Sequence, residues 1–153
     1  MSLYRTAARA ALSWALIAGP TSAWCAQYQS IGNEPAIFYD APTLRGIKTF
    51  VAPRGMPVEV IVVQGDWVRV RDSTGGFAWV EKKALVDKRT VVAIAKTGSA
   101  EVHAAADESS PVVFRVQAGI LLDLISAPAS GWVLVRHQDG QSGYVKVGDV
   151  WGE

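Results

Sequence analysis

The sequence predicts an all-β protein made of two small β-barrels in tandem. Three observations support this fold class. Valine-rich runs alternate between apolar and polar residues, glycine-containing turns separate them at short intervals, and one half of the chain repeats the other. Beyond the N-terminal segment no stretch shows the period of an amphipathic helix. A chain of 153 residues can hold one ordinary domain or two very small ones.

The first 26 residues differ from the rest of the chain. Arg5 and Arg9 precede a short apolar run at 10–18, and small residues follow it. This layout is typical of a secretory signal peptide, and the alternative is a buried core helix. The run is shorter than the roughly 20 residues of a permanent membrane helix. We therefore expect cleavage after Ala23 or Ala26, a periplasmic or secreted protein, and no stable membrane span after processing.

Cys25 is the only cysteine, so no intrachain disulfide can form. Its place just after the apolar run raises the possibility of lipidation. Trp24, however, stands where lipidation signals require a small residue. Otherwise Cys25 is either removed with the leader or left as the single thiol.

The charge balance argues against a nucleic-acid partner. The chain has 15 Lys+Arg and 14 Asp+Glu; the leader takes two arginines and no acids, which leaves 15 − 2 = 13 basic against 14 acidic side chains. No basic run is longer than two residues. Nucleic-acid binding depends on a clustered basic surface, and none is present here.

The internal repeat divides the chain into two units. Ala36–Phe38 aligns with Ala100–Val102 at a shift of 64, and Trp67–Arg71 aligns with Trp132–Arg136 at a shift of 65. A one-residue insertion in a loop explains the change of shift. We expect unit one at 28–87 and unit two at 90–151, separated by a short charged linker. Further matches are Phe50 with Phe114, Gly55 with Gly119, Val58–Ile61 with Leu122–Ile125, and Trp79-Val80 with Tyr144-Val145.

Each unit consists of short strands and tight turns. Trp67–Arg71 alternates fully, Asp72–Gly76 is a hairpin turn, and Phe77–Val80 is the return strand. Units of about 60 residues bury only modest cores. Curling five or six strands into a closed barrel also covers strand edges.

The motifs of each unit resemble those of bacterial SH3 domains, often called SH3b. Unit one contains the segments 65–71 (Gly-Asp-Trp-Val-Arg-Val-Arg) and 76–80 (Gly-Phe-Ala-Trp-Val), and unit two contains counterparts at 131–136 and 143–145. The resemblance covers residues 28–151 and implies two tandem SH3-like barrels. It also implies a binding role, because such domains in exported bacterial proteins are commonly linked to cell-wall recognition or protein contacts.

Catalytic chemistry is not indicated, so we expect neither an enzyme nor a cofactor. Only His103 and His137 are available as histidines, and no Cys/His spacing suits zinc. No glycine-rich phosphate loop precedes a helix, and no serine stands in a nucleophile elbow.

The aromatic residues are the remaining candidates for a site. Alternation places Val68 and Val70 on one face of their strand and Trp67 and Arg69 on the other, so Trp67 is not a simple core residue. With Tyr39 from the first loop it could form a shallow peptide groove. The alternative is that Trp67 covers the barrel exterior or a contact between the units. Candidate ligand-binding residues are Tyr39, Asp40, Trp67, Arg69, Trp132 and Tyr144.

Unit two differs in the first loop, where His103 replaces Tyr39, so we expect the site mainly in unit one. The predicted function is a non-catalytic exported module that binds an extended peptide, either a peptidoglycan stem or an envelope protein segment. The alternative is a structural subunit of an envelope complex that has no ligand of its own.

Overall fold

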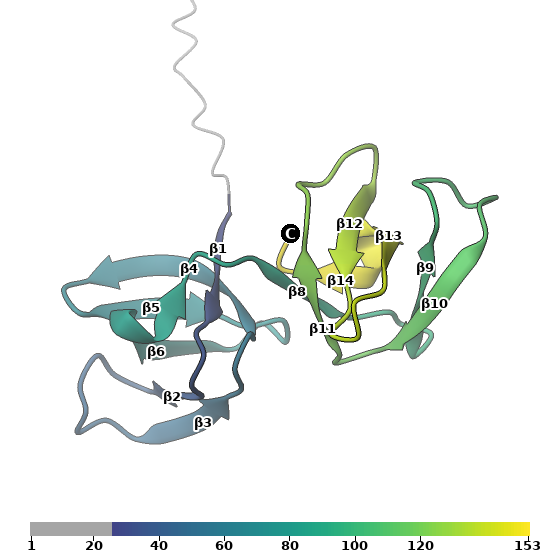
Figure 1. Ribbon diagram of the computed structural model, residues 1–153. Helices are drawn as coiled ribbons and strands as arrows, with labels where there is room; N and C mark the ends of the chain where they lie inside the picture. The colour runs from purple at the N-terminus through teal and green to yellow at the C-terminus, as the bar shows by residue number, and fades with distance from the viewer. Residues whose placement is uncertain (1–25) are drawn as a thin grey trace, which may run out of the picture.

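The computed structural model describes residues 26–153, which form two antiparallel seven-stranded sheets side by side (Figure 1). The expected signal peptide and Cys25 lie outside the described residues, apart from Ala26. In unit one the strand order is β3-β2-β6-β5-β4-β1-β7. Its strands are β1 (Gln27–Ile31), β2 (Ala36–Tyr39), β3 (Lys48–Ala52), β4 (Pro57–Gln64), β5 (Trp67–Arg71), β6 (Phe77–Glu81) and β7 (Leu85–Val86).

Unit two repeats this architecture with the order β10-β9-β13-β12-β11-β8-β14. Each strand holds the place of its counterpart, which confirms the prediction of an all-β fold with two similar units. Its strands are β8 (Thr90–Ala93), β9 (Ser99–His103), β10 (Val112–Gln117), β11 (Leu121–Leu124), β12 (Trp132–Arg136), β13 (Ser142–Lys146) and β14 (Val150–Trp151).

Each sheet curls around its own apolar core. Val68 and Val70 of β5 are 1% and 0% exposed, whereas Trp67 is half-buried and Arg69 is exposed. This is the face assignment that alternation predicts. The two cores are separate clusters, built mainly from valine with Ile31 and Phe38 in unit one and Leu122 in unit two.

The backbone repeats as closely as the sequence. Phe38 faces Phe50 across β2 and β3, and Val102 faces Phe114 across β9 and β10. Gly55 and Gly119 both adopt positive φ, +77° and +90°, a conformation that other residues rarely take. The alignment shift between the two units changes from 64 to 65 in a loop, as expected. This loop joins β4 to β5 in unit one and β11 to β12 in unit two.

Two details differ from the sequence-based expectation. A single 3₁₀ turn follows the return strand in each unit, at Lys82–Ala84 and Val147–Asp149, where the sequence indicates no helical segment. These turns are too short to show a period. Tyr39 belongs to the end of β2 rather than to a loop, because its Cα pairs with that of Trp79 in β6.

The junction between the units is hydrogen-bonded and partly buried. The Thr90 hydroxyl donates to the Gly55 carbonyl at 2.6 Å and lies 2.7 Å from the Ser30 hydroxyl, and Ser30 and Thr90 are both buried. Trp151 packs edge-on against Tyr28 with ring centroids 5.2 Å apart. The last strand of unit two therefore contacts the first strand of unit one. Within 26–153 no helix has the length and apolarity of a membrane span.

Candidate functional site

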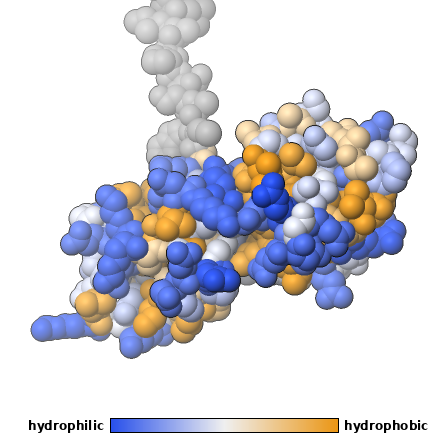
Figure 2. All heavy atoms as spheres, in the orientation of Figure 1, coloured by the Kyte–Doolittle hydropathy of each residue, from blue (hydrophilic) through white to orange (hydrophobic). Residues whose placement is uncertain are grey.

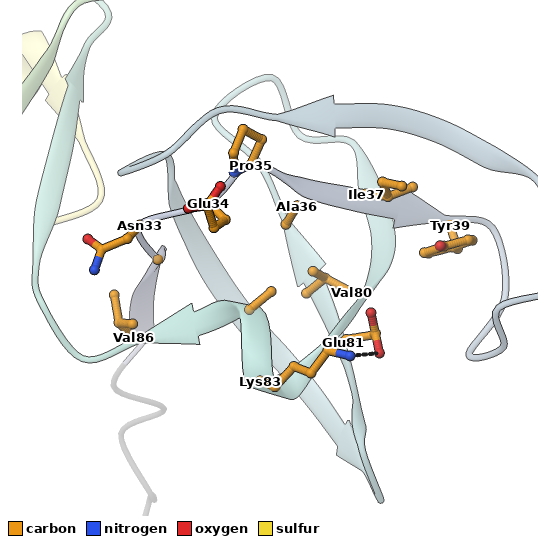
Figure 3. A pocket seen from close by; sticks show the side chains of 12 residues that line it. Asn33, Glu34, Pro35, Ala36, Ile37, Tyr39, Val80, Glu81, Lys83 and Val86 are labelled. Carbon is orange, nitrogen blue, oxygen red and sulfur yellow. Dashed lines mark ion pairs between the residues drawn. The ribbon is translucent and has the colours of Figure 1, made fainter.

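Unit one carries an apolar hollow beside the start of β2. Its volume is about 530 Å³, and it lies between the segment leading into β2 and the turn that follows β6 (Figure 3). Pro35, Ile37 and Tyr39 form one side, and Val80 and Val86 contribute on the other. The Glu81 carboxylate and the Lys83 ammonium are 2.8 Å apart at its rim. This contact raises the pKa of Lys83, chiefly through the hydrogen bond to Glu81.

Tyr39 joins this hollow to an aromatic cluster on the outside of the barrel. Its ring stands edge-on to that of Trp67, with centroids 5.4 Å apart and an interplanar angle of 88°. Trp79 pairs with Tyr39 in the sheet register and, like Trp67, is half-buried. We call Tyr39, Trp67 and Trp79 the aromatic cluster of unit one.

Tyr39 is only 4% exposed, so it is not the open groove wall that the sequence suggests. Its ring packs edge-on against Trp67. Trp67 does not line the hollow itself. The accessible aromatic surface of this cluster therefore comes from the two half-buried tryptophans, and the buried Tyr39 ring packs against Trp67.

Asp40 and Arg69 occupy different surroundings. The Asp40 carboxylate accepts a hydrogen bond from the Ile47 backbone N–H at 2.7 Å, which ties together the two ends of the loop between β2 and β3. Arg69 is exposed, and its guanidinium lies 5.1 Å from the centre of the Phe77 ring. Asp40 shapes the loop, while Arg69 is available at the surface of β5.

Unit two builds a matching cluster with different chemistry. Trp132 stands edge-on to His103 at 5.3 Å and 78°, as Trp67 does to Tyr39. Tyr144 pairs with His103 in the sheet register and holds the place of Trp79. The Lys146 ammonium lies 5.9 Å from the centre of the Trp132 ring. The structure thus places the sequence-predicted residues Trp132 and Tyr144 around His103.

Sequence reasoning missed Trp79 and the hollow itself. Trp79 could have been found, because strand parity across the hairpin puts it on the same face as Trp67. The hollow depends on how the segment before β2 passes the 3₁₀ turn, which strand alternation does not encode. Among residues 26–153 there is no group of three or more His, Cys, Asp or Glu side chains placed to hold a metal ion.

The fold, together with the aromatic cluster that occurs once in each unit, defines a protein of two tandem SH3-like domains. The family model for the bacterial SH3 domain matches the chain twice, at residues 33–87 and 96–152. The chain therefore belongs to the bacterial SH3 domain family, as the motifs of both units predict.

Solved structures that match parts of this chain include NlpC2 and NlpC1 from Trichomonas vaginalis and an NlpC/P60 family protein from Bacillus cereus ATCC 10987. Sequence identities are 12%, 11% and 16%, with TM-scores of 0.38, 0.39 and 0.37. The matches cover 84%, 92% and 81% of this chain but 49%, 51% and 55% of the other chains. The chain thus spans about half the length of each. No curated protein matches it.

Proposed function

We propose that this protein is an exported, non-catalytic module that binds an extended peptide through unit one. The observation that carries this proposal is the apolar hollow joined through Tyr39 to the two half-buried tryptophans. Bacterial SH3 domains are generally non-catalytic, which agrees with a binding role.

The chemistry of this surface suits an extended chain. Apolar side chains of a ligand can enter the hollow beside Pro35 and Ile37, while its backbone crosses the half-buried indoles of Trp67 and Trp79. Rigid aromatic residues lose little conformational entropy on binding, and pockets for alternate side chains give specificity. The charged rim of the hollow offers hydrogen bonds to peptide groups.

Substitution of Trp67 tests the site. Removing an anchor of a binding patch typically costs about 2 kcal/mol or more, roughly a thirtyfold loss of affinity. We expect Trp67→Ala to release the protein from its peptide ligand, and Trp132→Ala, the matched change in unit two, to have little effect. Tyr39→Phe is the appropriate change at that position, because Tyr39 is buried and alanine would destabilise unit one.

A pull-down on purified peptidoglycan measures the binding of the native protein and of Trp67→Ala. It also distinguishes the two sources of peptide. Retention on the wall that Trp67→Ala abolishes supports a peptidoglycan stem as the ligand. Recovery of one envelope protein through the same tryptophan supports a protein segment. If Trp67→Ala remains folded and binds like the native protein, the proposed site is wrong.

A structural role in an envelope complex is the second candidate. It is favoured by the apolar residues on the loop and strand after β2, since Leu44, Ile47 and Val51 are 64%, 71% and 64% exposed. In that case one stoichiometric protein partner is recovered, and charged substitutions at these three positions, rather than at Trp67, release it.

Export is proposed from the leader at residues 1–26. The intact mass of the protein recovered from a periplasmic extract checks it. We expect a mass that corresponds to cleavage after Ala23 or Ala26, and a full-length cytoplasmic protein would contradict the proposal.

A further inference from the structure

A second hollow lies in unit two, at the place that corresponds to the hollow of unit one. Its volume is about 420 Å³. Glu101 and His103 hold the places of Ile37 and Tyr39, and Lys146 holds that of Glu81. One hollow is apolar and the other is polar, although the same strands build both. The lining residues of the second are Thr97, Ser99, Glu101, His103, Glu108, Arg115, Lys146 and Asp149.

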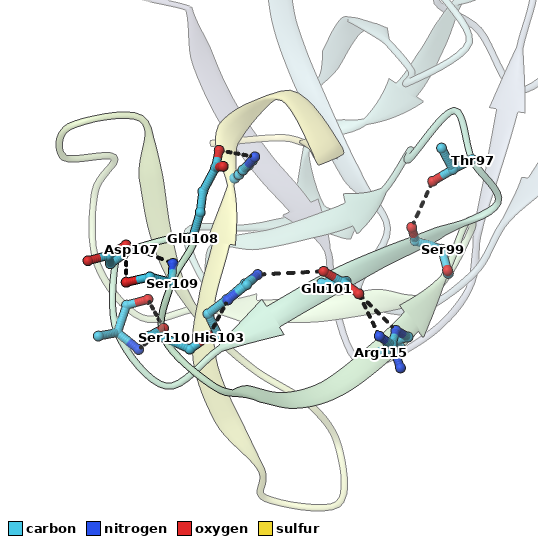
Figure 4. Close-up of polar contacts among 11 residues, drawn as sticks. Thr97, Ser99, Glu101, His103, Asp107, Glu108, Ser109, Ser110 and Arg115 are labelled. Carbon is cyan, nitrogen blue, oxygen red and sulfur yellow. Dashed lines mark hydrogen bonds and ion pairs between the residues drawn. The ribbon is translucent and has the colours of Figure 1, made fainter.

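His103 turns one ring nitrogen toward this hollow. The side chain is 9% exposed, and its Nδ1 lies 3.0 Å from the Ser110 carbonyl oxygen (Figure 4). A carbonyl oxygen only accepts hydrogen bonds, so Nδ1 is the donor in this contact, and in the neutral ring Nε2 then presents a lone pair. Nε2 has no hydrogen-bond partner within the described part of the chain; the group facing it is Glu101 Oε2, at 3.9 Å.

Glu101 is held in place by its other oxygen. Its Oε1 accepts hydrogen bonds from Arg115 Nε at 3.1 Å and Nη2 at 2.6 Å. Oε2 remains directed at His103 (Figure 4). Two acceptors, one of them charged, thus converge without a donor between them. A nitrogen at an ordinary distance of about 2.9 Å from each can donate to both.

The remaining charges of the hollow favour a cation. Arg115 is paired with Glu101, and Lys146 is paired with Glu108. Asp149 has no ion-pair partner among residues 26–153. The five charged groups sum to two positive and three negative, a net of −1. The charge left unpaired is negative and lies in the same hollow as the two acceptors.

We propose that Glu101 Oε2 and His103 Nε2 bind a primary ammonium group in the hollow of unit two. A metal ion would need more ligands than these two, and the described residues supply no third His, Cys, Asp or Glu in position. An ammonium has three donors, which suits two acceptors and leaves one donor for water. This site does not depend on the peptide site proposed in unit one.

The test is an NMR titration of the whole protein with Nα-acetyl-lysine methylamide. Nα-acetyl-norleucine methylamide is the uncharged match, and glycine methylamide supplies an α-ammonium. We expect saturable shifts of the His103 ring with one or both amines and none with the norleucine compound. Binding of the lysine compound indicates that the ligand's ammonium group comes from a side chain. Binding of glycine methylamide indicates that it comes from a peptide N-terminus.

Glu101→Gln and His103→Phe should each weaken this binding about tenfold or more. His103→Phe keeps an aromatic ring against Trp132, and Glu101 is exposed enough for its substitution to leave the fold intact. Asp87→Asn, a carboxylate outside the hollow, is the control for net charge and should bind as the native protein does. No binding by either amine, equal binding by the norleucine compound, or unchanged binding in Glu101→Gln would overturn the proposal and leave only a bound water between the acceptors.

Discussion

The two units share a core but differ on the face beside the first loop. Ile37 and Val51 face each other across β2 and β3 in unit one, and Glu101 and Arg115 occupy the same register positions in unit two. Tyr39 is matched by His103, and Leu44 by Glu108. Outward positions carry little packing constraint, so one barrel can present either an apolar or a charged surface without altering its interior.

Figure 2 shows hydrophilic residues and separate hydrophobic groups on both units in the face that is in view. Binding surfaces on the two units can therefore differ in chemistry while the junction residues Ser30 and Thr90 connect them. Duplication of the barrel gives this protein two surfaces, not two copies of one surface.

The largest expected effect compares equivalent core positions. Leu122 and Val58 are 1% and 0% exposed at the same place in the two units. Leu122→Ala should destabilise unit two by about 2–5 kcal/mol, and Val58→Ala should cost unit one less, since fewer carbon atoms are removed. Urea unfolding followed by residue-resolved NMR measures each unit separately. Equal losses would mean that the two units unfold as one.

A glycine–alanine pair should give effects of different size in the two units. Gly143 holds the place of Ala78, and a Cβ at Gly143 would come within 2.6 Å of the His103 carbonyl oxygen. Gly143→Ala should destabilise unit two by about 1–3 kcal/mol. The reverse change in unit one, Ala78→Gly, should cost about 0.5–1 kcal/mol. Thermal unfolding of both variants checks this, and a neutral Gly143→Ala would show that β9 can shift without cost.

The smallest effect is the pH dependence of the charged face. The Arg115 guanidinium lowers the pKa of Glu101, first by hydrogen bonding and then by its charge. A lowered folded-state pKa stabilises the protein above the unfolded-state pKa, and this contribution disappears as pH falls through the folded-state value. The stability difference between native protein and Glu101→Gln should therefore shrink from neutral to acid pH. Because the Glu101–Arg115 ion pair is exposed, this stability difference is small. Urea unfolding midpoints at neutral and at acid pH measure it. The control is Val51→Thr in unit one, whose effect on stability should not change with pH.

Strand alternation and the repeat were enough to predict the fold class, the inward valines of β5 and the outward Trp67. They also predicted that units one and two differ at Tyr39 and His103. These features are local or follow from comparing one segment with another, because the side-chain period of a strand is two wherever the strand lies.

Only the tertiary structure decided which side chains meet across strands. The burial of Tyr39 against Trp67 and the convergence of Glu101 and His103 both depend on register and on how loops close. So does the contact of Trp151 with Tyr28 at the junction. A β-sheet brings together residues far apart in the sequence, and the position of one strand beside another is not written in the alternation of either.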